Sequence, residues 1–324
     1  MRTILKSLVL GSVATVALAA SARADCGEVT ITEMNWASSS VVTAVAKFLM
    51  EEGYGCDVTA VPSDTVPAVT SVAETGRPDI VTELWINSAP QYVELEKEGK
   101  VETLGAVLSD GGEEGWFVPA YLVEEHPELA TIDGVLANPA LVGGRFHNCP
   151  EGWGCRTKND NLKVAYGFEE AGMEVFDHGS GETLATSMAS AYEDRQPWFG
   201  YYWKPTSLLG RYDMVKVDMG EYDAERHACI AREDCRNPQK TDFQTAEVLT
   251  GVTTDFAERE PEIASMMSKL SFTNDQMGGL LAWQEANKAS AEEVAVKFLS
   301  ENPDVWGAWL NDEAREKLAP LLNR

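Results

Sequence analysis

The sequence predicts an α/β protein of two lobes, and three observations support this. About 300 residues follow an N-terminal leader, more than one hydrophobic core usually serves. Segments typical of strands and helices alternate over residues 28–85, as they do in parallel α/β sheets. Strand-like segments at 111–119 and 246–253 would form two hinge crossovers. The expected bounds are 25–113 plus 246–324 for lobe one and 114–245 for lobe two.

Lobe one is expected to begin as strand, helix, strand, helix, strand. Residues 28–34 alternate apolar and polar side chains, and helix-capping residues at 35–40 precede a helix. Glycines 53 and 55 end that helix. The expected strands are 28–34, 56–61 and 79–85, and the expected helices are 41–52 and 65–75. Ligands of such sheets bind beyond the carboxyl ends of the strands.

Lobe two and the C-terminal part show the same kinds of segment. Residues 212–240 are rich in charged side chains and look like a surface elaboration. The expected lobe-two helices are 162–171 and 181–194, and its strands 174–176 and 198–203. The expected C-terminal helices are 261–269, 274–287, 290–300 and 311–322.

Residues 1–24 have the features of a secretory signal peptide. Arg2 and Lys6 precede an apolar run too short to span a bilayer, and the small residues around Ala24 suit cleavage there. A lipid-attachment cysteine box is absent at that point. We therefore expect a freely soluble periplasmic protein.

The charge balance limits the possible partners. Acidic residues outnumber basic ones, 52 to 26, which argues against nucleic acid as a partner because binding it needs a basic surface. The acidic run at Asp213, Asp218, Glu221 and Asp223 could bind calcium, although it lacks the ordered spacing of a calcium loop. A solvated acidic surface is the simpler interpretation.

Six cysteines remain in a compartment that favours disulfides. Six cysteines allow 15 pairings in principle. Spacing suggests two short loops, and the third pair follows by elimination. The expected disulfides are Cys149–Cys155, Cys229–Cys235 and Cys26–Cys56. A zinc site is not expected, because paired Cys-x-x-Cys spacing is missing and histidines are few.

Three tryptophans occupy positions that suit a ligand better than a core. Trp85 ends a predicted strand, Trp153 lies in a loop between two cysteines, and Trp203 precedes Lys204 and Pro205. A quaternary ammonium group has no proton to donate, so electron-rich ring faces hold it best. Trp283, Trp306 and Trp309 are expected to be structural, while Trp116 and Trp198 could belong to either class.

On these residues the chain resembles the glycine betaine and proline betaine binding proteins of ABC importers. The most specific piece is the segment 149–155, which is similar to the disulfide-closed ligand loop of that family. Trp85 is similar to the tryptophan after the third strand of lobe one, and the segment 202–205 to the part that supplies the third ring. The backbone N–H groups of Gly154 and Cys155 would then hold a ligand oxygen.

The resemblance implies a two-lobed periplasmic binding protein fold of type II and a function in import. It implies a monomer that is not an enzyme, needs no cofactor, and closes on a small methylated amine. The protein would deliver this ligand to an inner-membrane ABC permease and its ATPase.

Trp36 departs from the three-tryptophan arrangement of the betaine-binding members. Choline-binding relatives use an aromatic residue there, so Trp36 either forms a fourth wall or packs elsewhere. A fourth wall would favour compact ligands such as trimethylamine N-oxide or choline. Glu33 and Glu83 lie near two of these tryptophans in the sequence. Each is expected to be a solvated or structurally paired carboxylate, or to complement a ligand that lacks a carboxylate.

Two other functions use similar residues. Tryptophans also stack on sugars, so a secreted carbohydrate-active enzyme or sugar-binding protein is the first alternative. A sensor that uses the same pocket is the second. The Gly-Ser-Gly segment after His178 lacks the Gly-x-Ser-x-Gly pattern of a nucleophile elbow.

Overall fold

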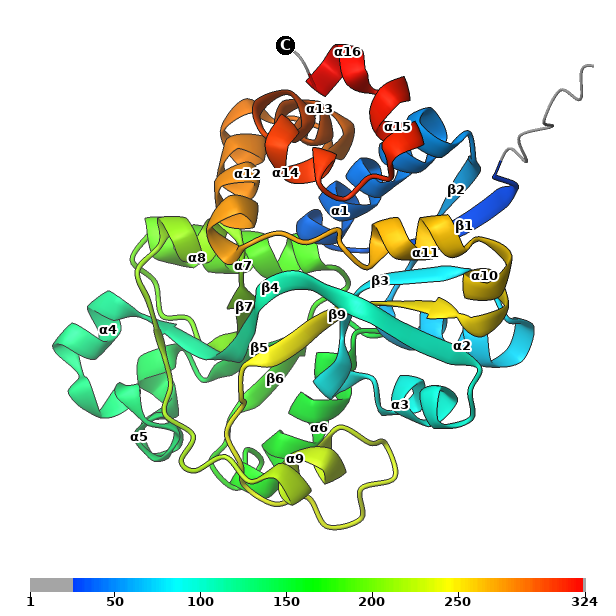
Figure 1. Ribbon diagram of the computed structural model, residues 1–324. Helices are drawn as coiled ribbons and strands as arrows, with labels where there is room; N and C mark the ends of the chain where they lie inside the picture. The colour runs from blue at the N-terminus through cyan, green and yellow to red at the C-terminus, as the bar shows by residue number, and fades with distance from the viewer. Residues whose placement is uncertain (1–25, 323–324) are drawn as a thin grey trace, which may run out of the picture.

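One long strand, β4 (Val101–Pro119), runs through both halves of the molecule (Figure 1). The computed structural model describes residues 26–322, so the predicted signal peptide lies outside the described part. The first half of β4 pairs antiparallel with β9 (Ala246–Thr253), and the second half with β7 (Gly200–Lys204). The change of partner falls between Gly112, opposite Ala246, and Glu113, opposite Lys204. The lobe boundary expected at 113–114 is one residue further along the chain, and it stays a prediction.

The strands form one sheet in the order β2-β1-β3-β9-β4-β7-β5-β6, with β8 beside β4. In lobe one, β1 pairs parallel with β2 and β3, as the alternating segments predict, while β9 and β4 add antiparallel strands. The other strands of this lobe are β1 (Glu28–Met34), β2 (Asp57–Ser63) and β3 (Ile80–Trp85). Its first helices are α1 (Ala37–Phe48), η1 (Leu49–Tyr54), α2 (Thr65–Thr75), η2 (Ile86–Ser88) and α3 (Pro90–Lys97).

The C-terminal helices belong to lobe one, where α13 packs on α1 (Figure 1). They are α10 (Thr254–Arg259), α11 (Pro261–Met267), α12 (Asn274–Asn287), α13 (Ala291–Glu301), α14 (Pro303–Gly307), α15 (Asp312–Lys317) and α16 (Ala319–Leu322). The predicted helix 274–287 is confirmed, with Thr273 and Gln276 forming a capping box at its start. The single helix expected over 311–322 is wrong, because the chain leaves helical hydrogen bonding at Leu318.

Lobe two surrounds the other half of β4. Its further strands are β5 (Arg145–Asn148), β6 (Glu174–Asp177) and β8 (Met214–Lys216). Its helices are α4 (Ala120–Glu125), η3 (Pro127–Ala130), α5 (Ile132–Ala137), η4 (Pro139–Val142), α6 (Gly154–Tyr166), α7 (Gly181–Glu193), α8 (Ser207–Arg211) and α9 (Ala224–Ile230). Among residues 26–322, no helix is long and apolar enough to cross a bilayer.

The helix predicted over 162–171 has different bounds. It begins at Gly154 and ends at Tyr166, and the following Gly167, with a positive φ of 73°, stops it. The apolar spacing of this helix is interrupted by Lys158, Asn159 and Asp160, so hydrophobic periodicity did not reveal its first two turns. Lys158 and Asn159 are nevertheless buried, because each has a polar partner inside the protein.

The tryptophans expected to be structural divide into two groups. Trp306 is fully buried and donates its indole N–H to the carbonyl of Leu299, while Trp309 stacks on Phe298. Trp283 is only half-buried, and the Lys297 ammonium lies 5.2 Å from its ring centroid.

The two undecided tryptophans are core residues of lobe two. Trp116 and Trp198 are both fully buried, and each indole N–H has an acceptor, Asn159 for the first and Ser187 for the second. The three expected disulfides, Cys26–Cys56, Cys149–Cys155 and Cys229–Cys235, are all formed.

A buried ion pair of lobe two lies where β4 changes partner, and a side chain of lobe one bonds to it. Glu114 of β4 accepts a hydrogen bond from Lys158 of α6 at 2.6 Å, and both side chains are almost fully buried. Asn87 of lobe one donates to the same carboxylate at 2.8 Å, as does the Tyr201 hydroxyl of β7. Burial opposes ionisation of Glu114, yet the Lys158 charge and these bonds hold the pKa of the carboxyl below its ordinary value.

Replacing Lys158 by Met should lower the free energy of unfolding by about 3 to 5 kcal/mol near neutral pH, because the Glu114 charge stays buried without a counter-charge. Without Lys158, burial raises the folded-state pKa of Glu114 above the unfolded-state value. The penalty is then complete above the raised folded-state pKa, and it shrinks as the pH falls from that value to the unfolded-state pKa. Urea unfolding at several pH values measures this loss.

The matched control for that experiment is the double variant Lys158→Met, Glu114→Gln. It removes both charges and should recover most of the lost stability. Equal losses in the single and double variants would contradict the role assigned to the unpaired charge.

Candidate functional site

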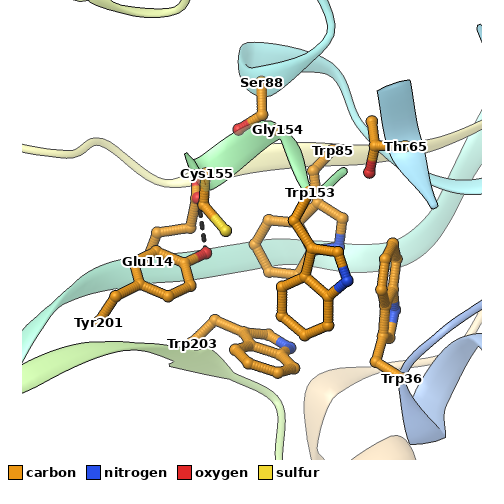
Figure 2. A pocket seen from close by; sticks show the side chains of 10 residues that line it. All are labelled: Trp36, Thr65, Trp85, Ser88, Glu114, Trp153, Gly154, Cys155, Tyr201 and Trp203. Atoms are coloured by element: carbon orange, nitrogen blue, oxygen red, sulfur yellow. Dashed lines mark hydrogen bonds between the residues drawn. The ribbon is translucent and has the colours of Figure 1, made fainter. Parts of the chain in front are cut away.

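Four tryptophans from both lobes meet around one small cavity (Figure 2). The ring centroids of Trp36 and Trp153 are 5.3 Å apart at an interplanar angle of 74°, and those of Trp153 and Trp203 are 5.1 Å apart at 83°. Near-perpendicular rings make walls of a box. The cavity is lined by Trp36, Thr65, Trp85, Ser88, Glu114, Trp153, Gly154, Cys155, Tyr201 and Trp203.

All six residues expected to bind the ligand, including Trp36, therefore lie on this cavity. Glu33 and Glu83 do not line it. Glu33 instead faces a wider cleft between the lobes, to which Trp36 and Trp203 also belong. Glu83 lies behind Trp36 and is fully buried.

The ends of two parallel strands position the lobe-one rings. Trp36 follows β1 and is the N-cap of α1, and its indole N–H donates to Glu83 at 2.6 Å. The serines after it begin the helix rather than precede it, so α1 starts earlier than the capping residues suggested. Trp85 is the last residue of β3. A Cβ at Gly112 would fall 2.2 Å from the Trp85 ring, so only glycine at this place in β4 leaves room for it.

Trp153 joins the two lobes as well as lining the cavity. It is the N-cap of α6, and its indole N–H donates to Asp64 of lobe one at 2.9 Å. The neighbouring carbonyl of Gly152 accepts a hydrogen bond from the backbone N–H of Val66 at 3.0 Å. Burial raises the pKa of the Asp64 carboxyl, and the bond from Trp153 partly offsets this.

The start of α6 supplies hydrogen-bond donors beside the rings. Gly154 and Cys155 are in the first turn, where backbone N–H groups have no acceptor within the helix and the helix dipole favours negative charge. A Cβ at Gly154 would lie 2.3 Å from the carbonyl oxygen of Ser88, so glycine permits this close approach of the lobes. The Ser88 hydroxyl is buried and has no hydrogen-bond partner among the described residues. These groups suit a small ligand oxygen.

Trp203 comes from β7 of lobe two. Its ring lies 4.7 Å from that of Tyr202 and is stacked at 6.3 Å on Tyr201. The Tyr201 hydroxyl donates to Glu114, the bond drawn in Figure 2. Side chains on both sides of Trp203 thus fix the plane of its ring.

The cavity also has a negative wall that the sequence did not reveal. Glu114 lines it with an ionised carboxylate, and its counter-charge, Lys158, does not line it. Thr65, Ser88 and Tyr201 were missed as well. The only sequence signal for Glu114 was its place in the glycine-rich crossover at 111–115, where a carboxylate reads as a surface residue.

Glu83 has three unusual features. Its φ of 51° is in the left-handed region, at an irregularity in the pairing of β3 with β9, which costs a residue of this type about 1 to 3 kcal/mol. One carboxylate oxygen accepts from Trp36 and from the Ser38 hydroxyl, each at 2.6 Å, and the other has no partner among the described residues. Burial raises the pKa of Glu83 to about 7, although interactions with Ser38, Trp36 and Trp85 oppose this.

The described residues contain no cluster of three or more histidine, cysteine or acidic side chains that could hold a metal ion. In the acidic run considered for calcium, Asp218 accepts from the backbone N–H of Gly220 and Asp223 caps α9. Calcium binding there stays a prediction.

Comparison with known proteins identifies the family of this chain. Residues 27–301 match the family described as the substrate-binding domain of ABC-type glycine betaine transport systems. The trimethylamine N-oxide-binding protein of Pelagibacter ubique (strain HTCC1062) is 23% identical over 287 residues, which are 84% of this chain and 87% of that protein.

Two solved structures share the fold. The glycine betaine/L-proline-binding protein of an ABC transporter from Borrelia burgdorferi has a TM-score of 0.74 at 18% identity, over 90% of this chain and 99% of that one. An ABC-transporter choline-binding protein in complex with choline has a TM-score of 0.73 at 19% identity, over 91% of this chain and 98% of that one.

These matches confirm the predicted fold, and they do not favour the alternative of a carbohydrate-active enzyme. The proteins of this family bind substrates for import and are not enzymes. The chain belongs to the family of substrate-binding domains of ABC-type glycine betaine transport systems.

Proposed function

We propose that this protein captures a compact methylated amine, of the choline or trimethylamine N-oxide type, by closure of its lobes. The observation that carries the proposal is the box of four indole rings, two from each lobe. Each desolvated ring can contribute up to about 2 kcal/mol to holding a methylated cation. The rings need help from polar groups to reach micromolar affinity, about 8.2 kcal/mol, because association has its own cost.

The polar groups support a ligand with a small oxygen and no carboxylate arm. The first-turn amides of α6 and the Ser88 hydroxyl offer donors to one oxygen. The ionised Glu114 on the cavity wall would attract the methylated cation and repel a ligand carboxylate. Trp36 closes the remaining side, which favours a short ligand over a long one.

The relatives support the same class. One is named for binding trimethylamine N-oxide, and one solved structure holds choline. We further propose that the protein acts as a monomer in the periplasm and passes its ligand to an ABC permease driven by an ATPase. Two further proposals are that a signal peptide is cleaved near Ala24 and that the acidic run binds calcium.

Isothermal titration with choline, trimethylamine N-oxide, glycine betaine and dimethylsulfoniopropionate tests the ligand class. Choline or trimethylamine N-oxide should bind more tightly than glycine betaine, because the betaine carboxylate approaches Glu114. Tightest binding of glycine betaine would contradict the charge argument. Binding of glucose or an oligosaccharide with none of the four compounds would overturn the proposal.

Trp153→Ala should weaken binding of the preferred compound by about 2 kcal/mol or more, roughly 30-fold, because one ring wall and the bond to Asp64 are both lost. The matched control is Trp283→Ala, which removes a half-buried ring outside the cavity and should leave the affinity unchanged. Titration of both variants decides the point, and wild-type affinity in Trp153→Ala would refute the cage.

A further inference from the structure

Glu83 is a buried carboxylate that lies outside the cavity and outside any ion pair among the described residues. It has no exposed surface, and the described residues bring it no lysine or arginine. Buried charges are normally paired, because removing them from water is costly. A strained, unpaired carboxylate in the sheet is therefore a feature that fold stability alone does not explain.

The geometry links Glu83 to the cavity through one ring. Its Oε1 atom accepts the Trp36 indole N–H at 2.6 Å, and the face of the same indole lines the cavity. Ser38, in the first turn of α1, holds Oε1 from the other side at 2.6 Å. A rotated Trp36 would lose this charge-assisted bond, so the carboxylate fixes the orientation of the Trp36 ring. That ring is the fourth wall, which a three-ring cage lacks.

The carboxylate also acts on the ligand through its charge. It lies one indole ring away from the cavity, in surroundings that screen charge poorly. Negative charge at the N–H edge makes the ring face a better partner for a cation. A methylated cation in the cage would in turn favour the ionised form of Glu83.

We propose, on the basis of the function proposed above, that Glu83 is a positioning residue for Trp36 and a second counter-charge of the cage, selecting ligands with a net positive charge. Choline carries such a charge, whereas trimethylamine N-oxide is neutral overall. Glu83 therefore favours choline more than it favours trimethylamine N-oxide.

The proposal makes binding depend on pH. The pKa of Glu83, raised by burial to about 7, places its ionisation within the accessible range. Binding of choline should then release protons near pH 7, because the bound cation lowers this pKa. A change of one pKa unit corresponds to about a tenfold change in affinity between the two protonation states.

Other charged groups near β3 do not replace Glu83 in this role. The neighbouring elements carry Glu33 on β1, Lys47 on α1, Glu74 on α2, Glu114 on β4 and Glu247 on β9. None forms a hydrogen bond or ion pair with Glu83 among the described residues. Lys47 pairs with Glu51, and Glu114 with Lys158. The pKa values of the buried His147 and His227 are lowered by burial to about 4, so both stay neutral between pH 6 and 8.

The ligand-binding test compares wild type with Glu83→Gln, which keeps the shape and the acceptor for Trp36. Isothermal titration with choline at pH 6, 7 and 8, in two buffers of different ionisation enthalpy, measures affinity and proton release together. Wild type should bind choline up to roughly tenfold more tightly at pH 8 than at pH 6 and release protons at pH 7. Glu83→Gln should bind more weakly at pH 8, with a flat profile and no proton release.

Two comparisons separate the charge of Glu83 from general effects. Glu33→Gln removes the same charge from the outer cleft and should keep the wild-type profile. With trimethylamine N-oxide as the probe, Glu83→Gln should lose less affinity than it does with choline. A Glu83→Gln variant with the wild-type choline affinity and pH profile overturns the inference, while the proposed function stands.

A ligand-free measurement keeps the test independent of the ligand. Because the folded-state pKa of Glu83 is raised to about 7 from its ordinary 4.5, wild type loses stability as the pH rises between these values. Glu83→Gln lacks this loss, so its melting temperature relative to wild type should rise from pH 5 to pH 8. A difference in melting temperature that stays constant with pH would overturn the inference, whatever the ligand-binding results are. Failure of wild type to bind choline or trimethylamine N-oxide would instead refute the proposed function.

Discussion

The contact of Trp153 with lobe one is the interaction on which the site depends. The same indole forms a wall of the cavity with one face, meets Trp36 across the cleft, and donates its N–H to Asp64. A quaternary ammonium head has no N–H to donate, so its recognition requires rings on several sides. Rings from two lobes can surround it only when the lobes are closed, which ties ligand binding to one conformation of the protein.

Two buried carboxylates, Glu114 and Glu83, place negative charge at or near the cavity, and their surroundings differ. Glu114 faces the cavity and is kept ionised by Lys158, at the place where β4 passes from one lobe to the other. Glu83 lies behind Trp36, has only neutral donors, and carries strain in its backbone. The first provides a permanent charge, and the second a charge that depends on its surroundings. A well-packed apolar residue in place of either carboxylate would stabilise the fold at least as much.

The sequence predicted the parts of this molecule whose signals are local. Strand β9 and helix α12 follow from apolar periodicity, and Trp85, Trp153 and Trp203 stand out because glycine, proline or a strand end lies beside them. Strand β5 was missed because its four residues include Arg145 and His147. The roles of Glu83 and Glu114 depend on contacts over 47 and 44 residues of chain, which no local pattern records.

The glycine beneath Trp85 couples the hinge to the cavity. Gly112 is the last residue of β4 that pairs with lobe one, and the Trp85 ring rests where its side chain would be. A ring of the cavity thus rests on the backbone at the place where β4 passes from one lobe to the other. A side chain at Gly112 would displace the Trp85 ring, although Gly112 itself does not line the cavity.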